Sequence, residues 1–191
     1  PLPRLTAVLP GCGGTMRLEI EDFEVEELPA YLPSGEGDHL YLWIEKRDMA
    51  AETLRKVVAR TLGVSAGDIG MAGLKDRRAV TRQWLSVPRR SAGLVERLAD
   101  QRIVVLEAVP HRNKLRTGHL KGNRFRIRLR GVDPNADALV QAKIAAIAGR
   151  GVPNFYGSQR MGHGGATMAA GWALAHGASG FVRLHLPDGT E

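Results

Sequence analysis

The sequence has few of the features that identify common classes of enzyme. It contains one cysteine, Cys12, in 191 residues, which excludes an internal disulfide and any metal site built from cysteines. No run approaches the ~18 apolar residues that a membrane span needs, and no charged, apolar and small-residue succession marks a signal peptide. We therefore expect a cytoplasmic protein.

Motifs for several kinds of site are also missing. There is no Gly-x-Gly-x-x-Gly after a predicted strand, no His-Glu-x-x-His, no EF-hand loop and no Gly-x-Ser-x-Gly. The glycine-rich residues 34–39 lack the lysine and the hydroxyl residue of a phosphate loop. His111 and His119 lie eight residues apart with no carboxylate or thiol nearby, which is a poor metal site. The sequence predicts no bound metal.

What is abundant is positive charge, and it is localised. Lysine and arginine exceed aspartate and glutamate by 27 to 20, a net charge of +7. Residues 75–130 hold 16 of the basic residues and only 4 acidic ones, whereas residues 1–74 are net acidic. A concentrated basic segment is the electrostatic footprint of nucleic-acid binding, because phosphate neutralisation supplies most of the affinity. A basic surface that is merely solvated is the alternative.

Hydrophobic periodicity predicts an α+β fold with a mixed, largely antiparallel sheet flanked by helices. Alternation with period two, or a short apolar run, predicts strands, which we expect at residues 15–21 (extended by Phe23 and Val25), 39–45, 68–72, 80–87, 103–109, 123–130 and 181–186. Apolar stripes with helical spacing predict helices near residues 49–62, 134–149 and 166–176, and a shorter one after Ser91. Asp48 is the expected N-cap of the first of these helices, Gly63 its left-handed terminator, and Pro134 the first residue of the second.

One carboxylate stands among cations in the segment 71–87. Asp76 follows a glycine turn and has Lys75, Arg77, Arg78 and Arg82 within six residues. Nearby positive charge favours the ionised form of a carboxylate, which suits a nucleophile or a base. Gln83 and Trp84 follow on opposite faces of the next strand. An exposed, charged hairpin turn is the alternative.

The segment 111–130 is the most basic part of the chain. Its first part is a loop in which Lys114 and Arg116 are the expected phosphate contacts. Its second part alternates four arginines with Phe125, Ile127 and Leu129. We interpret Phe125 as a stacking surface for a base, as is common at single-stranded RNA sites. A strand with a solvated basic face is the alternative.

The segment 153–162 has no clear periodicity but carries two adjacent aromatic residues, an amide and an arginine between glycines. Loops with such residues bind ligands more often than they pack. Asn154, Gln159 and Arg160 are its candidate binding residues.

Several of these segments, in order, resemble the tRNA pseudouridine synthase D (TruD) family. The blocks are Glu21-Asp22-Phe23, Gly35-Glu36-Gly37 with His39-Leu40, Gly73-Leu74-Lys75-Asp76 with Gln83-Trp84, Leu120-Lys121-Gly122-Asn123 with Phe125, and Asn154-Phe155-Tyr156-Gly157 with Gln159-Arg160. They cover about residues 15–176. Two positions depart from the family pattern: Arg17 stands in place of a lysine, and Met161 in place of a phenylalanine.

The resemblance implies a tRNA pseudouridine synthase that needs no metal or redox cofactor. Asp76 would attack C1′ of the target uridine or remove its C2′ proton, and the first guess for the target is uridine 13 of a glutamate-type tRNA. Phe125 would stack on the base, and Asn123 would bond to Asp76 or to the uracil edge. Lys75 and Arg17 would hold the carboxylate or a phosphate. Phe23 and the 154–160 residues would complete the pocket.

We expect residues 1–191 to form one catalytic domain, monomeric, from which the domain inserted in other family members is missing near residues 177–180. Either the chain lacks that domain or the sequence joins segments on both sides of it. A non-catalytic RNA-binding module of the same fold is therefore an alternative function. A glycosidase is a weaker one, because no second carboxylate stands beside Asp76.

Overall fold

The computed structural model describes residues 5–99, 101–152, 157–161 and 165–177. The chain divides into two compact units. Gly13–Pro134 form one unit, which holds the sheet, and Pro1–Cys12 with Asn135–Glu191 form the other. The expectation of a single domain remains a prediction, and we describe each unit by itself.

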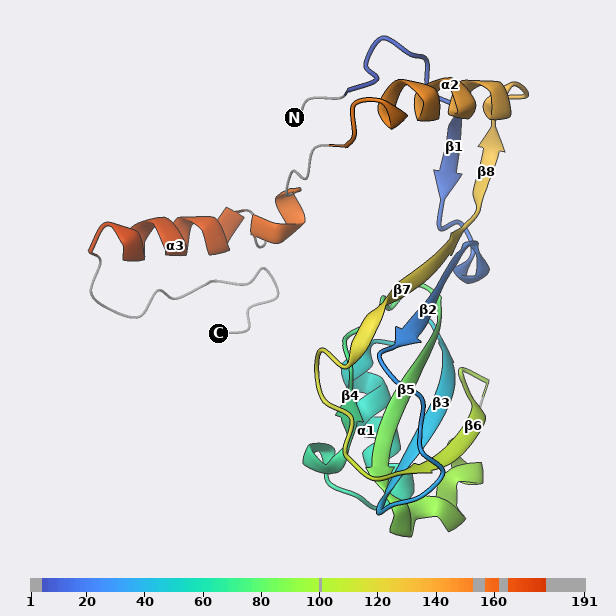
Figure 1. The fold of residues 1–191 in the computed structure, drawn as a ribbon, viewed down its shortest axis with the longest axis vertical. Helices are drawn as coiled ribbons and strands as arrows, with labels where there is room; N and C mark the ends of the chain where they lie inside the picture. The colour runs from blue at the N-terminus through green and yellow to red at the C-terminus, as the bar shows by residue number, and fades with distance from the viewer. Residues whose placement is uncertain (1–4, 100, 153–156, 162–164, 178–191) are drawn as a thin grey trace. The chain divides into compact units, whose positions relative to one another are not determined.

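The first unit is built on a mixed, largely antiparallel sheet (Figure 1), which confirms the predicted α+β class. Its strands follow the order β6-β3-β5-β2-β7, and a short β4 pairs with the C-terminal part of β5. Among the strand pairs of the described residues, only β2 and β5 run parallel. The strand bounds are β2 Phe23–Pro29, β3 His39–Arg47, β4 Gly70–Met71, β5 Val80–Pro88, β6 Ile103–His111 and β7 Leu120–Ile127.

A second, two-stranded sheet pairs β1, Gly13–Met16, with β8, Leu129–Val132. The predicted strand 15–21 is therefore wrong beyond Met16. Arg17 has a φ of 58°, in the left-handed region, which ends the strand. Residues Ile20–Asp22 then form a 3₁₀ turn, in which the Asp22 carboxylate accepts a hydrogen bond from the Glu19 N–H at 3.0 Å. The local hydrogen bonds of this turn outweigh the alternating pattern.

The helix α1, Ala51–Leu62, covers one face of the large sheet (Figure 1). Its Leu54, Val58 and Leu62 are buried against inward-facing residues of β3 and β5 such as Ile44 and Leu85. Burying a side chain of this size stabilises the fold by about 1.5–3 kcal/mol. This layer is the main core.

The ends of α1 test two predictions. Gly63 has a φ of 62° and terminates the helix, as predicted. Asp48 is not the N-cap: Ala50 occupies that position, and its side chain makes no capping hydrogen bond. Asp48 instead lies in the turn after β3 with a φ of 41°, a conformation that aspartate tolerates better than most residues.

Two further elements differ from the sequence prediction. The short helix predicted after Ser91 is a 3₁₀ helix, η3, that spans Arg89–Leu98; a smaller one, η2, spans Ala66–Asp68. The apolar sequence of β6 predicts a buried strand, but Val104 and Leu106 are exposed. Within the described residues β6 pairs only with β3, so it lies at the edge of the sheet.

The second unit contains α2, Ala136–Ala148, α3, Ala166–Ala175, and a 3₁₀ turn, η4, Ser158–Met161. Pro134 is not the first residue of α2, because Asn135 is its N-cap. Lys143 donates a hydrogen bond to the Leu9 carbonyl at 3.1 Å. The predicted strand 181–186 lies outside the described residues. No described helix is both long and apolar enough to cross a membrane.

Gly70 provides a test of how closely the 111–119 loop packs on the sheet. A Cβ at this position would lie 2.2 Å from the Leu115 carbonyl oxygen and 2.3 Å from Ser86 Oγ. Gly70→Ala should therefore lower the free energy of unfolding by about 1–3 kcal/mol, measured by urea denaturation. Gly93→Ala is the control, because nothing lies within 4 Å of its added Cβ. Equal stability of the two variants would contradict this packing.

Candidate functional site

Asp76 lies on the irregular loop between β4 and β5, and its side chain is 40% exposed. Arg17 is its ion-pair partner, with Nη2 3.0 Å from Oδ1. Because both groups are partly solvated, the pair stabilises the fold by at most about 1 kcal/mol. The pair matters for geometry, because it connects Arg17, whose backbone is in the left-handed conformation after β1, with the Asp76 carboxylate 59 positions away in the sequence.

None of the four cations that surround Asp76 in the sequence forms an ion pair with its carboxylate among the described residues. Arg82 pairs with Glu45 at 2.8 Å, and Arg77 lies 3.8 Å from Asp48. Arg78 donates to the Leu18 carbonyl. The four sequence neighbours are therefore not the cations that pair with Asp76, since proximity along a loop does not fix where long side chains point. The role of Asp76 itself stays a prediction.

The buried ammonium group of Lys46 holds the backbone of the loop that carries Asp76. Lys46, fully buried on β3, donates to the backbone carbonyl of Asp76 at 2.8 Å and to that of Met49 at 2.6 Å. Desolvation by burial lowers the pKa of Lys46 to about 8, while the Asp76 carboxylate partly counteracts the shift.

Lys75 makes a second buried contact beneath the loop. Its Nζ lies 2.6 Å from Glu27 Oε2, and both side chains are almost completely buried. The other carboxylate oxygen of Glu27 accepts a hydrogen bond from the Trp84 N–H at 3.3 Å. Lys75, which was expected to hold the Asp76 carboxylate or a phosphate, instead forms an internal ion pair that links the loop to β2.

Two phenylalanines extend the site from Arg17. The Arg17 guanidinium lies 3.7 Å from the centre of the Phe23 ring, which meets the Phe125 ring edge-on at 6.0 Å. Phe23 is buried, whereas Phe125 is 53% exposed. Asn123 is exposed beside them, opposite Glu27 in the β2–β7 register, and makes no hydrogen bond to Asp76. Phe125 and Asn123 thus remain accessible to a ligand.

The face of the sheet beneath the loop also carries buried polar side chains. Thr81 is the cross-strand partner of Lys46, and Gln83 is that of Ile44. Gln83 is fully buried, and neither atom of its amide finds a hydrogen-bond partner among the described residues. Trp84 points to the opposite face, against Tyr41 and Trp43, as the sequence predicts.

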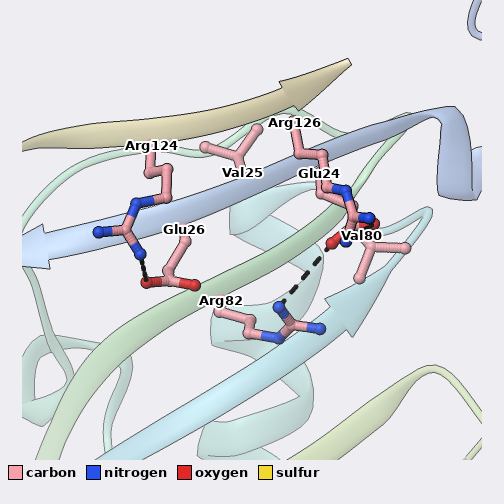
Figure 2. Close-up of a pocket in the computed structure, with 7 residues that line it drawn as sticks. All are labelled: Glu24, Val25, Glu26, Val80, Arg82, Arg124 and Arg126. Carbon is pink, nitrogen blue, oxygen red and sulfur yellow. Dashed lines mark hydrogen bonds and ion pairs between the residues drawn. The ribbon is translucent and has the colours of Figure 1, made fainter. Parts of the chain in front are cut away.

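The arginines of β7 lie on the other face from Phe125. Arg124 pairs with Glu26 at 3.1 Å, and both Arg126 and Arg82 lie within 4 Å of Glu24. Figure 2 shows these side chains around a pocket of about 180 Å³. The carboxylates of β2 compensate these arginines, so this face is a weaker phosphate site than its sequence suggests.

Asp22 holds the start of β2 to β8. Both oxygens of its buried carboxylate accept hydrogen bonds from Arg130 Nε, at 2.9 and 2.8 Å. These bonds hold the pKa of Asp22 below its ordinary value.

The predicted phosphate-binding loop is only partly free. Lys114 donates to the Gly67 carbonyl, and the neighbouring Arg112 pairs with Glu36. Arg116 is exposed and forms no ion pair within the described residues. Asn154 lies outside the described residues. Gln159 and Arg160 belong to η4, in the second unit, so their relation to Asp76 stays a prediction.

Sequence reasoning missed Glu27 and Lys46. Each is a charged residue at an inward position of an alternating strand: Glu27 follows Phe23 and Val25, and Lys46 follows Leu42 and Ile44. A charge on the apolar side of a strand needs a buried partner. That signal was present, although the partner could not be identified from it.

The family model for tRNA pseudouridine synthase D (TruD) matches residues 3–183. A protein named tRNA pseudouridine synthase D from Anaeromyxobacter dehalogenans is 50% identical over 178 residues, and one from Thermus thermophilus is 48% identical over 181. These alignments cover 92% and 93% of this chain and 50% of each relative. A crystal structure of a Methanosarcina mazei protein assigned to TruD superposes with a TM-score of 0.80 at 34% identity, over 92% of this chain and 41% of that one.

The chain therefore belongs to the TruD family. It spans about half the length of the curated relatives that it matches.

The Lys75–Glu27 pair predicts an asymmetric response to mutation. Lys75→Met leaves Glu27 as an uncompensated buried charge, which should cost about 3–5 kcal/mol of unfolding free energy. Adding Glu27→Gln removes the charge and keeps the oxygen that accepts from Trp84 N–H, so the double variant should be more stable than Lys75→Met. Chemical denaturation measures both. A double variant that is less stable than Lys75→Met would contradict the buried pair.

Proposed function

We propose that this chain carries the catalytic centre of a tRNA pseudouridine synthase, which isomerises a uridine of tRNA to pseudouridine. The observation that carries the proposal is the Asp76 carboxylate, which contacts Arg17 and is linked through Arg17 and Phe23 to the exposed Phe125, in a chain of the TruD family. The names of the relatives support the same activity and the same class of substrate.

The reaction breaks the bond between C1′ of the ribose and N1 of the uracil, turns the freed base and joins its C5 to C1′. A proton is lost from C5, and N1 gains one. Asp76 begins the reaction in one of two ways. Its carboxylate bonds to C1′ as N1 leaves and is displaced when C5 bonds to C1′, or it takes the C2′ proton as N1 leaves and returns it to C2′ when C5 bonds to C1′. Both roles need an ionised carboxylate that reaches the ribose.

The surroundings of Asp76 suit the remaining requirements. The target nucleotide must leave its helix to be reached, and the detached uracil must be retained while it turns. Phe125 offers a ring face for stacking, and the Asn123 amide can bond to the uracil edge. Arg17, already on Asp76, orients the carboxylate and lies where it can also meet the ribose phosphate.

For the finer assignments, the family resemblance favours uridine 13 of a glutamate-type tRNA as the target. We also propose that the protein acts as a monomer in the cytoplasm and that its 191 residues are a catalytic domain. The competing function is an RNA-binding module of the same fold without turnover, to which the localised positive charge of residues 75–130 points equally. Asp76 argues against it, since RNA binding alone has no use for an exposed carboxylate.

Asp76→Asn tests the assignment at pH 7. It should lower the single-turnover rate of pseudouridine formation about 1,000-fold or more, since a positioned base contributes roughly 10²–10⁴. Affinity for tRNA should change little, because the volume is conserved. Glu26→Gln is the matched control: its carboxylate is similarly exposed and also pairs with an arginine, on the other face of the sheet. Turnover of Asp76→Asn at the rate of Glu26→Gln would remove Asp76 from the mechanism.

The loop 112–119 makes a separate prediction about RNA binding. Replacing Lys114 and Arg116 by glutamine should weaken tRNA binding and reduce the slope of log affinity against log salt by about 0.7–0.9 for each phosphate that the loop no longer neutralises. Arg124→Gln is the comparison, because Arg124 is exposed but already paired with Glu26. The same slope in wild type, in the double variant and in Arg124→Gln would show that this loop does not bind the tRNA.

A further inference from the structure

Lys46 is a charged residue in a position that the fold alone would fill with an apolar side chain. It continues the inward series of Leu40, Leu42 and Ile44 on β3, and none of its surface is exposed. A methionine would occupy similar space without placing an ammonium group out of contact with water. Desolvating an ammonium group is strongly unfavourable unless good hydrogen bonds compensate it.

The hydrogen bonds of Lys46 go to two segments that lack regular structure. One is to the Met49 carbonyl, in the turn between β3 and α1, and the other is to the Asp76 carbonyl. Lys46 therefore ties the loop 72–79 to the start of α1. Other hydrogen bonds to the loop backbone lie at its two ends: Asp48 N–H donates to the Ala79 carbonyl at 3.2 Å, and Gly118 N–H donates to the Ala72 carbonyl at 2.8 Å.

The charged groups around Lys46 favour this arrangement only in part. The Asp76 and Asp48 carboxylates stabilise its ammonium form, and Lys75 from the same loop opposes it. On its own strand, Glu45 pairs with Arg82, and Arg47 pairs with Glu45 and Glu21. The neighbouring strands place Thr81 and Ile103 opposite Lys46, and the inward residues of α1 are apolar. The Asp76 loop is thus the principal charged partner of Lys46.

We propose that Lys46 is a positioning residue, which holds the backbone of Asp76 so that its carboxylate meets the ribose of the target uridine. The proposal rests on the function proposed above and deepens it. Fixing the Asp76 carbonyl fixes the direction of its Cα–Cβ bond, while Arg17 fixes the far end of the side chain. Small displacements of a reacting group are enough to slow a reaction about 100-fold.

The proposal implies an alkaline limit to the reaction. Burial places the pKa of Lys46 at about 8, so the ammonium form is lost as the pH rises through that value. The neutral amine donates weaker hydrogen bonds to the carbonyl groups and no longer attracts the carboxylate. The single-turnover rate should therefore fall above pH 8.

The same titration acts on folding in the opposite direction, because the unfolded chain holds this proton more tightly than the folded one. The Lys46 contribution to stability therefore rises between pH 8 and the ordinary lysine pKa. A falling rate would thus not reflect unfolding.

Two variants of the full chain test the role. Lys46→Met removes both hydrogen bonds, and Lys46→Gln keeps an N–H₂ donor without the charge. At pH 7 we expect Lys46→Met to lower the single-turnover rate about 10- to 100-fold with tRNA affinity unchanged. Lys46→Gln should recover part of the rate and lack the part of the fall above pH 8 that Lys46 causes. Titration of the uracil itself would persist in Lys46→Gln, so the difference from wild type isolates Lys46.

Amide hydrogen exchange gives a readout that does not depend on turnover. Exchange in residues 73–79 should accelerate about tenfold or more in Lys46→Met, while the amides of α1 stay protected. Unchanged exchange and an unchanged rate would overturn the positioning role. If wild type binds tRNA but forms no pseudouridine, the proposed function fails, and exchange still decides whether Lys46 anchors the loop. If Lys46→Met does not fold, the pH profile and loop exchange of Lys46→Gln against wild type decide.

Discussion

The loop that carries Asp76 has no regular structure, and two buried ammonium groups hold it in place. Lys46 binds the carbonyl of Asp76, and Lys75 reaches across to Glu27 on β2. Burying charge is unfavourable in itself, so these contacts belong to the part of the molecule where geometry matters more than stability. The apolar layer between α1 and the sheet supplies the stability that offsets their cost.

The period of a β-strand explains why the site lies on one face only. On β2 and β7, alternate residues place Phe23, Glu27, Asn123 and Phe125 on the side of Asp76. They place Glu24, Glu26, Arg124 and Arg126 on the other side (Figure 2). The same two strands therefore provide an accessible aromatic surface and a compensated charge ladder. Reading the arginines of β7 as one basic surface overlooks the carboxylates of its neighbour, which only the strand pairing reveals.

Local chemistry made much of the fold predictable. The alternation in residues 39–45 and 80–87 predicted β3 and β5, and Gly63 marked the end of α1 because few other residues adopt a left-handed conformation. The choice of Asp76 as the reacting carboxylate stays a prediction. The sequence could not show the break at Arg17, where a local turn overrides the alternation, or the contacts of Lys46 and Glu27, which join residues 30 and 48 positions apart. Long-range partners of buried charges depend on strand order, which no local pattern encodes.

The most direct test is tritium release from tRNA that carries the isotope at C5 of its uridines, with the 191-residue chain as the only protein. Joining C5 to C1′ expels the hydrogen at C5, so a synthase should release tritium in amounts equal to the pseudouridine formed. Binding of the tRNA with no release of tritium, even from tRNA in large molar excess over the chain, would contradict the account. That result would favour an RNA-binding module in which Asp76 is held by the same contacts but does not react.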